Sequence, residues 1–214
     1  MQSPPAGLPV STFNCTQPFR YPIISGILID DFTELRSDTS FEAAGQSQGT
    51  PESNKAGLRI LEKYPVSRDI ITRYFHEFAN QFLGYKNEFM ITTSWTTRLK
   101  KGDIIHEHNH ANSFYSGVFY HGETYGDPPD GMLWFKNPIR DQARYEFEAD
   151  RENYVDHDFS IIPQPNLLVL FPSQIKHWVY PYNGKEDRVS LAFNIIPKGC
   201  YGIGDSYIDT SWTK

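Results

Sequence analysis

The sequence has no apolar run long enough to cross a membrane. None of its segments reaches about 18 consecutive apolar residues, and a membrane-spanning helix needs about 20. The N-terminal segment MQSPPAGLPVSTFN also has no basic stretch followed by an apolar one, so we expect no secretory signal. These absences predict a globular protein of the cytoplasm.

Cysteine and clustered positive charge are also scarce. Cys15 and Cys200 are the only cysteines, and without an export signal they are more typical of free thiols than of a disulfide. The 20 Lys and Arg against 26 Asp and Glu give a net charge of -6, with no basic cluster. Because nucleic-acid binding uses a cationic track along the phosphates, no nucleic-acid partner is expected.

Aromatic residues are abundant, with 15 Phe, 13 Tyr and 4 Trp among 214 residues. They suit sheet surfaces as well as ligand clefts, and core packing is the simpler explanation for any one of them. The prolines of residues 1–25 predict an extended lead-in that can end in an edge strand. A short helix is expected near Asp31 to Ser37, and the composition of residues 40–56 predicts a loop.

The clearest helix is predicted between Pro65 and Gly84. Ser67 is a candidate N-cap, and Gly84 is expected to end the helix. Steps of 4, 3 and 4 residues place one apolar stripe along this helix, formed by Ile71, Phe75, Phe78 and Phe82. Such a stripe must pack against a hydrophobic surface, for which a sheet is the obvious candidate.

From Glu88 onward the pattern changes to the alternation of strands. Strands are expected at 89–99, 114–121, 132–135, 158–162, 167–171, 177–180 and 188–196. This order predicts a mainly β protein with flanking helices, of jelly-roll or cupin type. We expect one domain over 1–214, with a lead-in and supporting helices in 1–87, the β core in 88–197 and a loosely packed tail in 198–214.

Residues 106–110 concentrate histidine. His106, His108 and His110 alternate with other residues, so on a strand they would share one face. Two imidazoles on one face can bind a single metal ion. Three do so less readily, because the outermost pair would lie ~13 Å apart. A histidine-rich surface turn explains this segment alone equally well.

A second pattern strengthens the metal hypothesis. His177 begins one predicted strand and Arg188 the next, across a turn that contains Gly184. A histidine from a distant strand would complete three facial ligands and leave three octahedral positions open. Arg188, with Ser190 two residues later, could bind a carboxylate bidentately. The combination suits a dicarboxylic co-substrate that chelates the metal at one end and pairs with arginine at the other.

Three groups of residues follow one another in an order and spacing that are more specific than any group alone: His108–Ser113 with Ser116–Tyr120, then Gly131–Pro138, then Leu168–Pro172 with His177, Arg188–Ser190 and Phe193–Asn194. In this order they resemble the 2-oxoglutarate/iron(II) oxygenase superfamily, most of all its branch common in bacteria and phages, with prolyl-hydroxylase-like relatives. The resemblance covers residues 95–196, about half of the chain.

The resemblance implies a double-stranded β-helix with iron(II) at its mouth and 2-oxoglutarate as co-substrate. His108 falls on the first metal ligand and His177 on the distal histidine. Arg188 falls on the residue that binds the far carboxylate of 2-oxoglutarate, with Ser190 as its hydroxyl helper. Tyr120 falls where prolyl-hydroxylase-like relatives place a tyrosine against the co-substrate.

The activity implied is hydroxylation of a C–H bond with release of succinate and carbon dioxide, in a bacterial cell or a phage-infected host. The substrate is expected to be a peptide, an amino acid or a small metabolite. Two hypotheses compete: a three-histidine cupin-like metalloenzyme that does not use 2-oxoglutarate, and a non-enzymatic jelly-roll binding module.

One position departs from the family pattern, which has a carboxylate where this chain has His110. Imidazole suits iron(II), so we expect His108, His110 and His177 to form the metal site. Water in place of His110, or a His106–His108 pair, are the alternatives; the pair fits the family register worst.

The remaining candidates are aromatic residues and histidines. Trp134, Tyr120 and Tyr115 are candidates for lining the cleft. Structural roles are expected for His76 and His157, whereas His121 could approach the cleft from the end of its strand.

Overall fold

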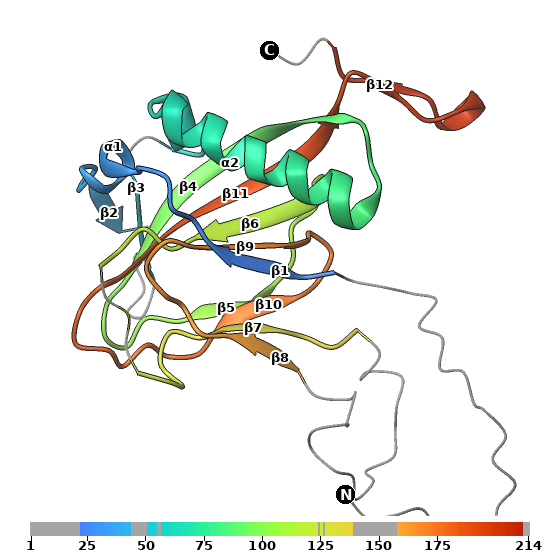
Figure 1. Cartoon of the computed structure of the whole chain (residues 1–214). Helices are drawn as coiled ribbons and strands as arrows, with labels where there is room; N and C mark the ends of the chain where they lie inside the picture. Colours follow the sequence, from blue (N-terminus) through green and yellow to red (C-terminus); the bar gives the residue numbers. More distant parts are fainter. Residues whose placement is uncertain are drawn as a thin grey trace, which may run out of the picture.

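The computed structural model describes residues 22–43, 51–54, 57–123, 125, 127–138 and 158–211. Two antiparallel sheets face each other at its centre (Figure 1). The larger sheet has seven strands in the order β1 (Ile24–Ile27), β9 (Leu167–Pro172), β6 (Tyr115–Phe119), β11 (Arg188–Lys198), β4 (Glu88–Leu99), β3 (Glu52–Asn54) and β2 (Phe41–Ala43). The smaller has the order β5 (Ile105–His108), β10 (His177–Val179), β7 (Leu133–Phe135) and β8 (Phe159–Ile161).

Alternation along the strands divides the core in two. On one side of the larger sheet, α2 (Pro65–Phe78) packs its apolar stripe onto β6 and β11, with η1 (Ile60–Glu62) and α1 (Thr33–Arg36) at its edge (Figure 1). On the other side, apolar residues of both sheets meet, among them Val118, Leu133 and Phe171. The strands that carry the predicted site residues therefore lie between a helix and a second sheet.

All seven strands expected after residue 88 are present, to within a few residues at each end. The short helix near Asp31 is α1, and the lead-in ends in β1, an edge strand paired with β9. Two expectations need correction. The segment expected as a loop at 40–56 carries β2 and β3, which pair in the register Phe41↔Asn54; its residues 44–50 and 55–56 lie outside the described part.

The second correction concerns the long helix. Its N-cap is Tyr64, with Pro65 in the first turn, and Ser67 is fully buried rather than capping. The helix continues as a π-helical turn, η2 (Ala79–Leu83), to Gly84, which ends it at φ 72 as expected. Because a π turn changes the angular phase of the helix, Phe82 leaves the buried stripe and is 64% exposed.

The C-terminal segment forms a small hairpin of its own. β12 (Cys200–Tyr201) pairs with β13 (Ile208–Asp209) around the short helix η4 (Gly204–Ser206), away from the two main sheets (Figure 1). Cys200 is a free, exposed thiol, whereas Cys15 and His157 lie outside the described residues. Among the described residues, no helix is long and apolar enough to cross a membrane.

Candidate active site

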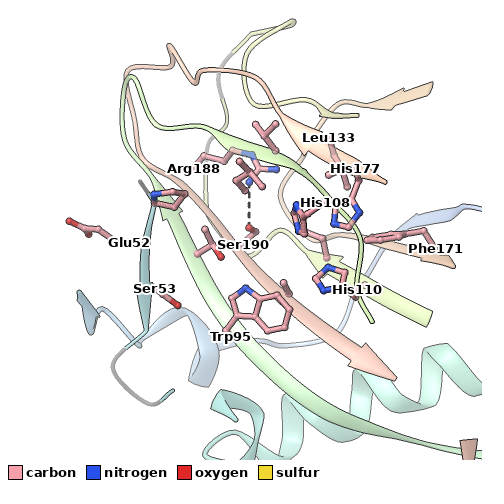
Figure 2. A pocket seen from close by; sticks show the side chains of 17 residues that line it. Glu52, Ser53, Trp95, His108, His110, Leu133, Phe171, His177, Arg188 and Ser190 are labelled. Carbon is pink, nitrogen blue, oxygen red and sulfur yellow. Dashed lines mark hydrogen bonds between the residues drawn. The ribbon is translucent and has the colours of Figure 1, made fainter. Parts of the chain in front are cut away.

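A cavity of about 250 Å³ lies between the two sheets (Figure 2). Its walls come from β3, β4, β6, β9 and β11 of the larger sheet and from β5, β7 and β10 of the smaller one. Apart from Arg188 and the histidines, most of the lining is apolar or small, including Leu133, Phe171 and Ala192. The polar groups that do reach it are therefore set in a poorly hydrated environment.

Three histidines meet at one end of this cavity. His108 ends β5, His177 begins β10 directly opposite in the antiparallel register, and His110 comes from the turn after β5. One ligand nitrogen from each lies within 4.8 Å of the other two. The ring centroids of His108 and His177 are 4.3 Å apart, and His110 lies 5.1 Å from each. The structure thus brings together the three histidines predicted as ligands.

His106 does not join them, although strict alternation would place it on the same face as His108. The pairing of β5 with β10 shifts by one residue, from His177↔His108 to Val179↔Ile105. This bulge turns Ile105 and His108 toward the cavity and leaves His106 exposed at a separate pocket on the outer face of the sheet. The geometry therefore places His106 outside the cluster.

Two of the three rings are held in a tautomer that suits a metal. The Nδ1 of His108 donates to the carbonyl of His106 at 2.7 Å, and the Nδ1 of His177 donates to that of Ile175 at 3.0 Å. A carbonyl only accepts, so Nδ1 carries the proton and Nε2 keeps its lone pair. Hydrogen bonds of this kind, from the nitrogen that does not face the metal, usually orient metal-binding histidines.

Burial also keeps two of the three histidines, His110 and His177, neutral. Desolvation, followed by the nearby charge of His108, lowers the pKa of His177 to about 3 and that of His110 to about 4. A metal ion therefore meets little competition from protons at neutral pH. Nitrogens bound at about 2.1 Å and at right angles lie about 3 Å apart, so these nitrogens are within about 2 Å of the separation that one ion requires. The donor set fits iron(II).

Arg188 occupies the other end of the cavity and is 1% exposed. Its Nε donates to the carbonyl of Gly131 at 2.9 Å, and Nη2 donates to the Tyr120 hydroxyl at 2.9 Å. Nη1 lies 3.4 Å from the Ser190 hydroxyl. In the described part of the chain, no carboxylate pairs with this guanidinium. A buried charge without a counter-ion is unfavourable unless a ligand supplies one.

Tyr120 and Gly131 contact Arg188 on the side away from the cavity and fix its side chain in place. Tyr120 is fully buried, does not line the cavity, and also offers its ring to the guanidinium at 4.9 Å. Gly131 adopts φ +65, and a Cβ there would lie 3.2 Å from the Arg188 side chain. The sequence placed Tyr120 against the co-substrate; the structure places it against the arginine. Gly131 was missed as a contact, although a glycine before a predicted strand was a usable signal.

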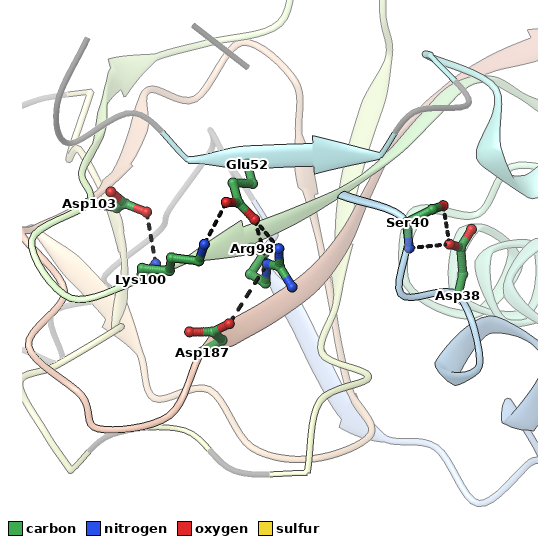
Figure 3. Close-up of polar contacts among 7 residues, drawn as sticks. All are labelled: Asp38, Ser40, Glu52, Arg98, Lys100, Asp103 and Asp187. Atoms are coloured by element: carbon green, nitrogen blue, oxygen red, sulfur yellow. Dashed lines mark hydrogen bonds and ion pairs between the residues drawn. The ribbon is translucent and has the colours of Figure 1, made fainter. Parts of the chain in front are cut away.

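One side of the cavity is formed by β3 and β4. Pro51, Ser53, Trp95 and Thr97 line it, and none of these was predicted. On the outer face, Glu52 joins β3 to β4 through Arg98 and through Lys100, whose Nζ lies 2.6 Å away (Figure 3). Asp187, next to Arg188, lies 3.7 Å from the Arg98 Nε. These ion pairs fasten β3 to β4 beside the cavity.

Other candidates lie elsewhere. Trp134 faces outward, stacked on Trp178, because its strand neighbours Leu133 and Phe135 take the inward positions. Tyr115 packs under α2, so neither aromatic lines the cleft. His76 has the expected structural role, since its Nε2 accepts the Phe89 N–H at 2.9 Å. His121 is buried beside Phe119 and does not reach the cavity.

Comparison with solved structures supports the fold. An epimerase, SnoN, described as non-heme and alpha-ketoglutarate-dependent, from nogalamycin biosynthesis, shares 13% identity (TM-score 0.58; 91% of this chain, 85% of that one). A 2OG-Fe(II) oxygenase family protein from Burkholderia pseudomallei shares 15% identity, with a TM-score of 0.55 over 76% of this chain and 75% of that one. HygX from Streptomyces hygroscopicus, solved with nickel, 2-oxoglutarate and hygromycin B, shares 11% identity, with a TM-score of 0.54 over 83% of each chain. These likenesses confirm the double-stranded β-helix.

The family comparison concerns the part of the chain that holds the site. Residues 93–194 match the family described as "Putative 2OG-Fe(II) oxygenase", and they include all three clustered histidines and Arg188. No curated protein matches the chain. The family match, the iron-compatible histidine cluster and the shared fold agree: over residues 93–194, just under half of its length, the chain is similar to the 2-oxoglutarate/iron(II) oxygenases.

Proposed function

We propose that His108, His110 and His177 hold iron(II), that Arg188 binds the distal carboxylate of 2-oxoglutarate, and that the enzyme hydroxylates a C–H bond of a peptide, an amino acid or a small metabolite. The observation that carries this proposal is the buried Arg188, which has no carboxylate partner among the described residues and lies in the same cavity as the histidine cluster. A dicarboxylate is the ligand that satisfies both ends at once.

The donors of Arg188 support this role. Arginine has five N–H donors, and its contacts with Gly131, Tyr120 and Ser190 engage three of them. Two donors remain for a carboxylate, and Ser190 can rotate its hydroxyl toward the same anion. Because the backbone carbonyl and Tyr120 fix the guanidinium plane, little side-chain entropy is lost when the anion binds.

The iron, when bound, supplies the oxygen activation that converts 2-oxoglutarate and dioxygen to succinate and carbon dioxide. The protein itself orients the co-substrate and keeps water out of the cavity. The histidines and Arg188 hold the two ends of the co-substrate, while apolar walls such as Phe171 and Val179 exclude water from between them. Three neutral histidines leave the metal one charge unit more positive than the usual set with a carboxylate, which should alter its reactivity with oxygen.

The test begins with anaerobic titration of the iron(II)-loaded protein with 2-oxoglutarate, followed by succinate measurement after oxygen is admitted. We expect saturable binding and succinate release. His177→Ala should abolish both by removing a metal ligand, whereas His106→Ala is the matched control and should behave as wild type. A loaded protein without affinity for 2-oxoglutarate would instead favour a three-histidine enzyme that does not use it.

We further propose that the protein acts in the cytoplasm and that its substrate enters past Pro51, Ser53 and Trp95. The cavity of about 250 Å³ must also hold the co-substrate, so only a small, uncharged part of the substrate fits beside it. A screen of amino acids, peptides and small metabolites for enhanced succinate release tests this class. Stimulation by nucleic acid alone would contradict it.

A further inference from the structure

His110 is held differently from the other two histidines. It lies beyond the end of β5, in a turn where Asn112 has φ 55, so no strand ladder fixes it. In the described part of the chain its ring makes no hydrogen bond, and its neighbours are the Trp95 ring, 5.7 Å away, and the two other imidazoles. The orientation of this ring must therefore come from the turn that carries it.

Ser173, directly after β9, ties that turn together. Its carbonyl accepts the N–H of His110 at 2.9 Å, and its own N–H donates to the carbonyl of Phe114 at 3.2 Å. Its hydroxyl donates to that of Ser113 at 2.9 Å and lies 2.8 Å from that of Ser116. One fully buried serine thus contacts both ends of the turn from His110 to Phe114.

The network continues into the larger sheet. The Ser116 hydroxyl, 1% exposed, lies 2.8 Å from Oδ1 of Asn194, whose Nδ2 lies 3.0 Å from the Thr93 hydroxyl. Each hydroxyl has one proton. Because Ser173 donates to Ser113, Ser116 donates to Ser173, and its contact with Asn194 then needs a turned amide. Buried networks of this kind are rigid when every member is satisfied.

We propose that Ser173, with Ser113 and Ser116, positions His110 as the third metal ligand. This inference rests on the proposed function. The hydroxyl network does for His110 what the carbonyls of His106 and Ile175 do for the other two rings, but it acts through the backbone of the turn. Losing such outer-shell support typically weakens metal binding about 10–100-fold.

The experiment compares Ser173→Ala and Ser116→Ala with wild type in cobalt(II) titrations, which report both affinity and the visible absorption of the bound ion. We expect both variants to bind cobalt(II) at least about 10-fold more weakly and with an altered spectrum. Ser94→Ala is the matched control. Ser94 is equally buried and its hydroxyl accepts the Leu61 N–H at 3.0 Å, but on the helix-facing side of the sheet.

The background variant His110→Ala separates the possible failures. If His110→Ala itself leaves the cobalt spectrum unchanged, His110 is not a ligand and the proposed ligand set is wrong. If His110→Ala changes the spectrum but both serine variants match wild type, only the positioning role is overturned. When His110 is absent, Ser173→Ala should have no further effect on affinity; a second full loss would show that it acts elsewhere. Should Ser173→Ala not fold, Ser116→Ala decides.

Discussion

The two faces of strand β11 bury different kinds of side chain. Toward α2, strand β11 presents Leu191, Phe193 and Ile195, each at most 1% exposed. Toward the smaller sheet it presents Arg188, Ser190 and Ala192 around the cavity. One strand therefore supplies stabilising apolar burial on one face and a buried charge on the other. Stability and ligand binding are assigned to opposite sides of the same sheet, so they should respond to mutation independently.

The largest effect should come from Phe75→Ala on the helix-facing side. Phe75 is fully buried and contacts the rings of Phe78, Phe89 and Tyr115. We expect a loss of about 3–5 kcal/mol in the free energy of unfolding, measured by urea denaturation. Phe82→Ala is the control, since this exposed residue should cost little. A large change in the metal affinity of the folded protein would show that the helix-facing side also affects ligand binding.

Arg188→Met tests the opposite face. We expect the affinity for 2-oxoglutarate to fall by about 2–5 kcal/mol, at least about 30-fold, with cobalt(II) affinity unchanged. The ligand-free protein should unfold at or above the wild-type denaturant concentration, because the variant removes a buried charge that has no counter-ion in the described part of the chain. Arg73→Met, in an exposed ion pair with Asp30, is the control. Equal losses of metal and co-substrate would contradict the role of Arg188.

His121 sharpens the comparison because it is a titratable group buried outside the cavity. Desolvation lowers its pKa to about 4, and its Nε2 has no partner within the described residues. The unfolded state, with a pKa near about 6.5, takes up a proton first. The neutral His121 therefore costs no stability above about pH 6.5. As the pH falls from there toward 4, the free energy of unfolding decreases by at most about 1.4 kcal/mol per pH unit.

His121→Leu should remove that part of the acid sensitivity. The measurement compares urea midpoints at pH 7.5 and at pH 5 for the two metal-free proteins. The variant should lose less stability than wild type between these values. An identical pH dependence would show that His121 does not contribute.

The smallest effect is expected from Tyr120→Phe. Its hydroxyl accepts a hydrogen bond from Arg188, and losing a bond to a charged group costs about 1.5 kcal/mol, or about 10-fold in 2-oxoglutarate affinity. Tyr125→Phe is the matched control, because Tyr125 packs against Tyr120 but bonds to the backbone of Gly122 and Val189. If both variants bind 2-oxoglutarate equally well, Tyr120 does not position the arginine.

The strands and the two ends of the cavity were predictable because they depend on local alternation and on recognisable spacing. His177 and Arg188 begin strands whose burial pattern reads directly from the sequence. The short strands β2 and β3 were missed because they are polar and are held by pairing with the edge of β4, a long-range effect. The direction of Trp134 and the exposure of Phe82 depended on the phase of a strand and on a π turn, which composition does not specify.

The turn carrying His110 shows the same limit more clearly. Ser173 lies 63 positions after it in the chain, and no local pattern links the two. Its contribution is a backbone carbonyl and a hydroxyl, groups that almost any serine offers. Such support becomes visible only when the packing of β9 against β6 is known.

The bulge in β5 makes this site tolerant of substitution and intolerant of a change in chain length. Its extra residue lets one short strand present Ile105 and His108 inward while His106 and Glu107 face solvent. Exchanging either exposed residue should leave the histidine cluster intact. Deleting one of them would return the strand to simple alternation and turn a neighbouring side chain to the wrong face. Homologous sequences should therefore vary in identity at positions 106 and 107 but conserve their number.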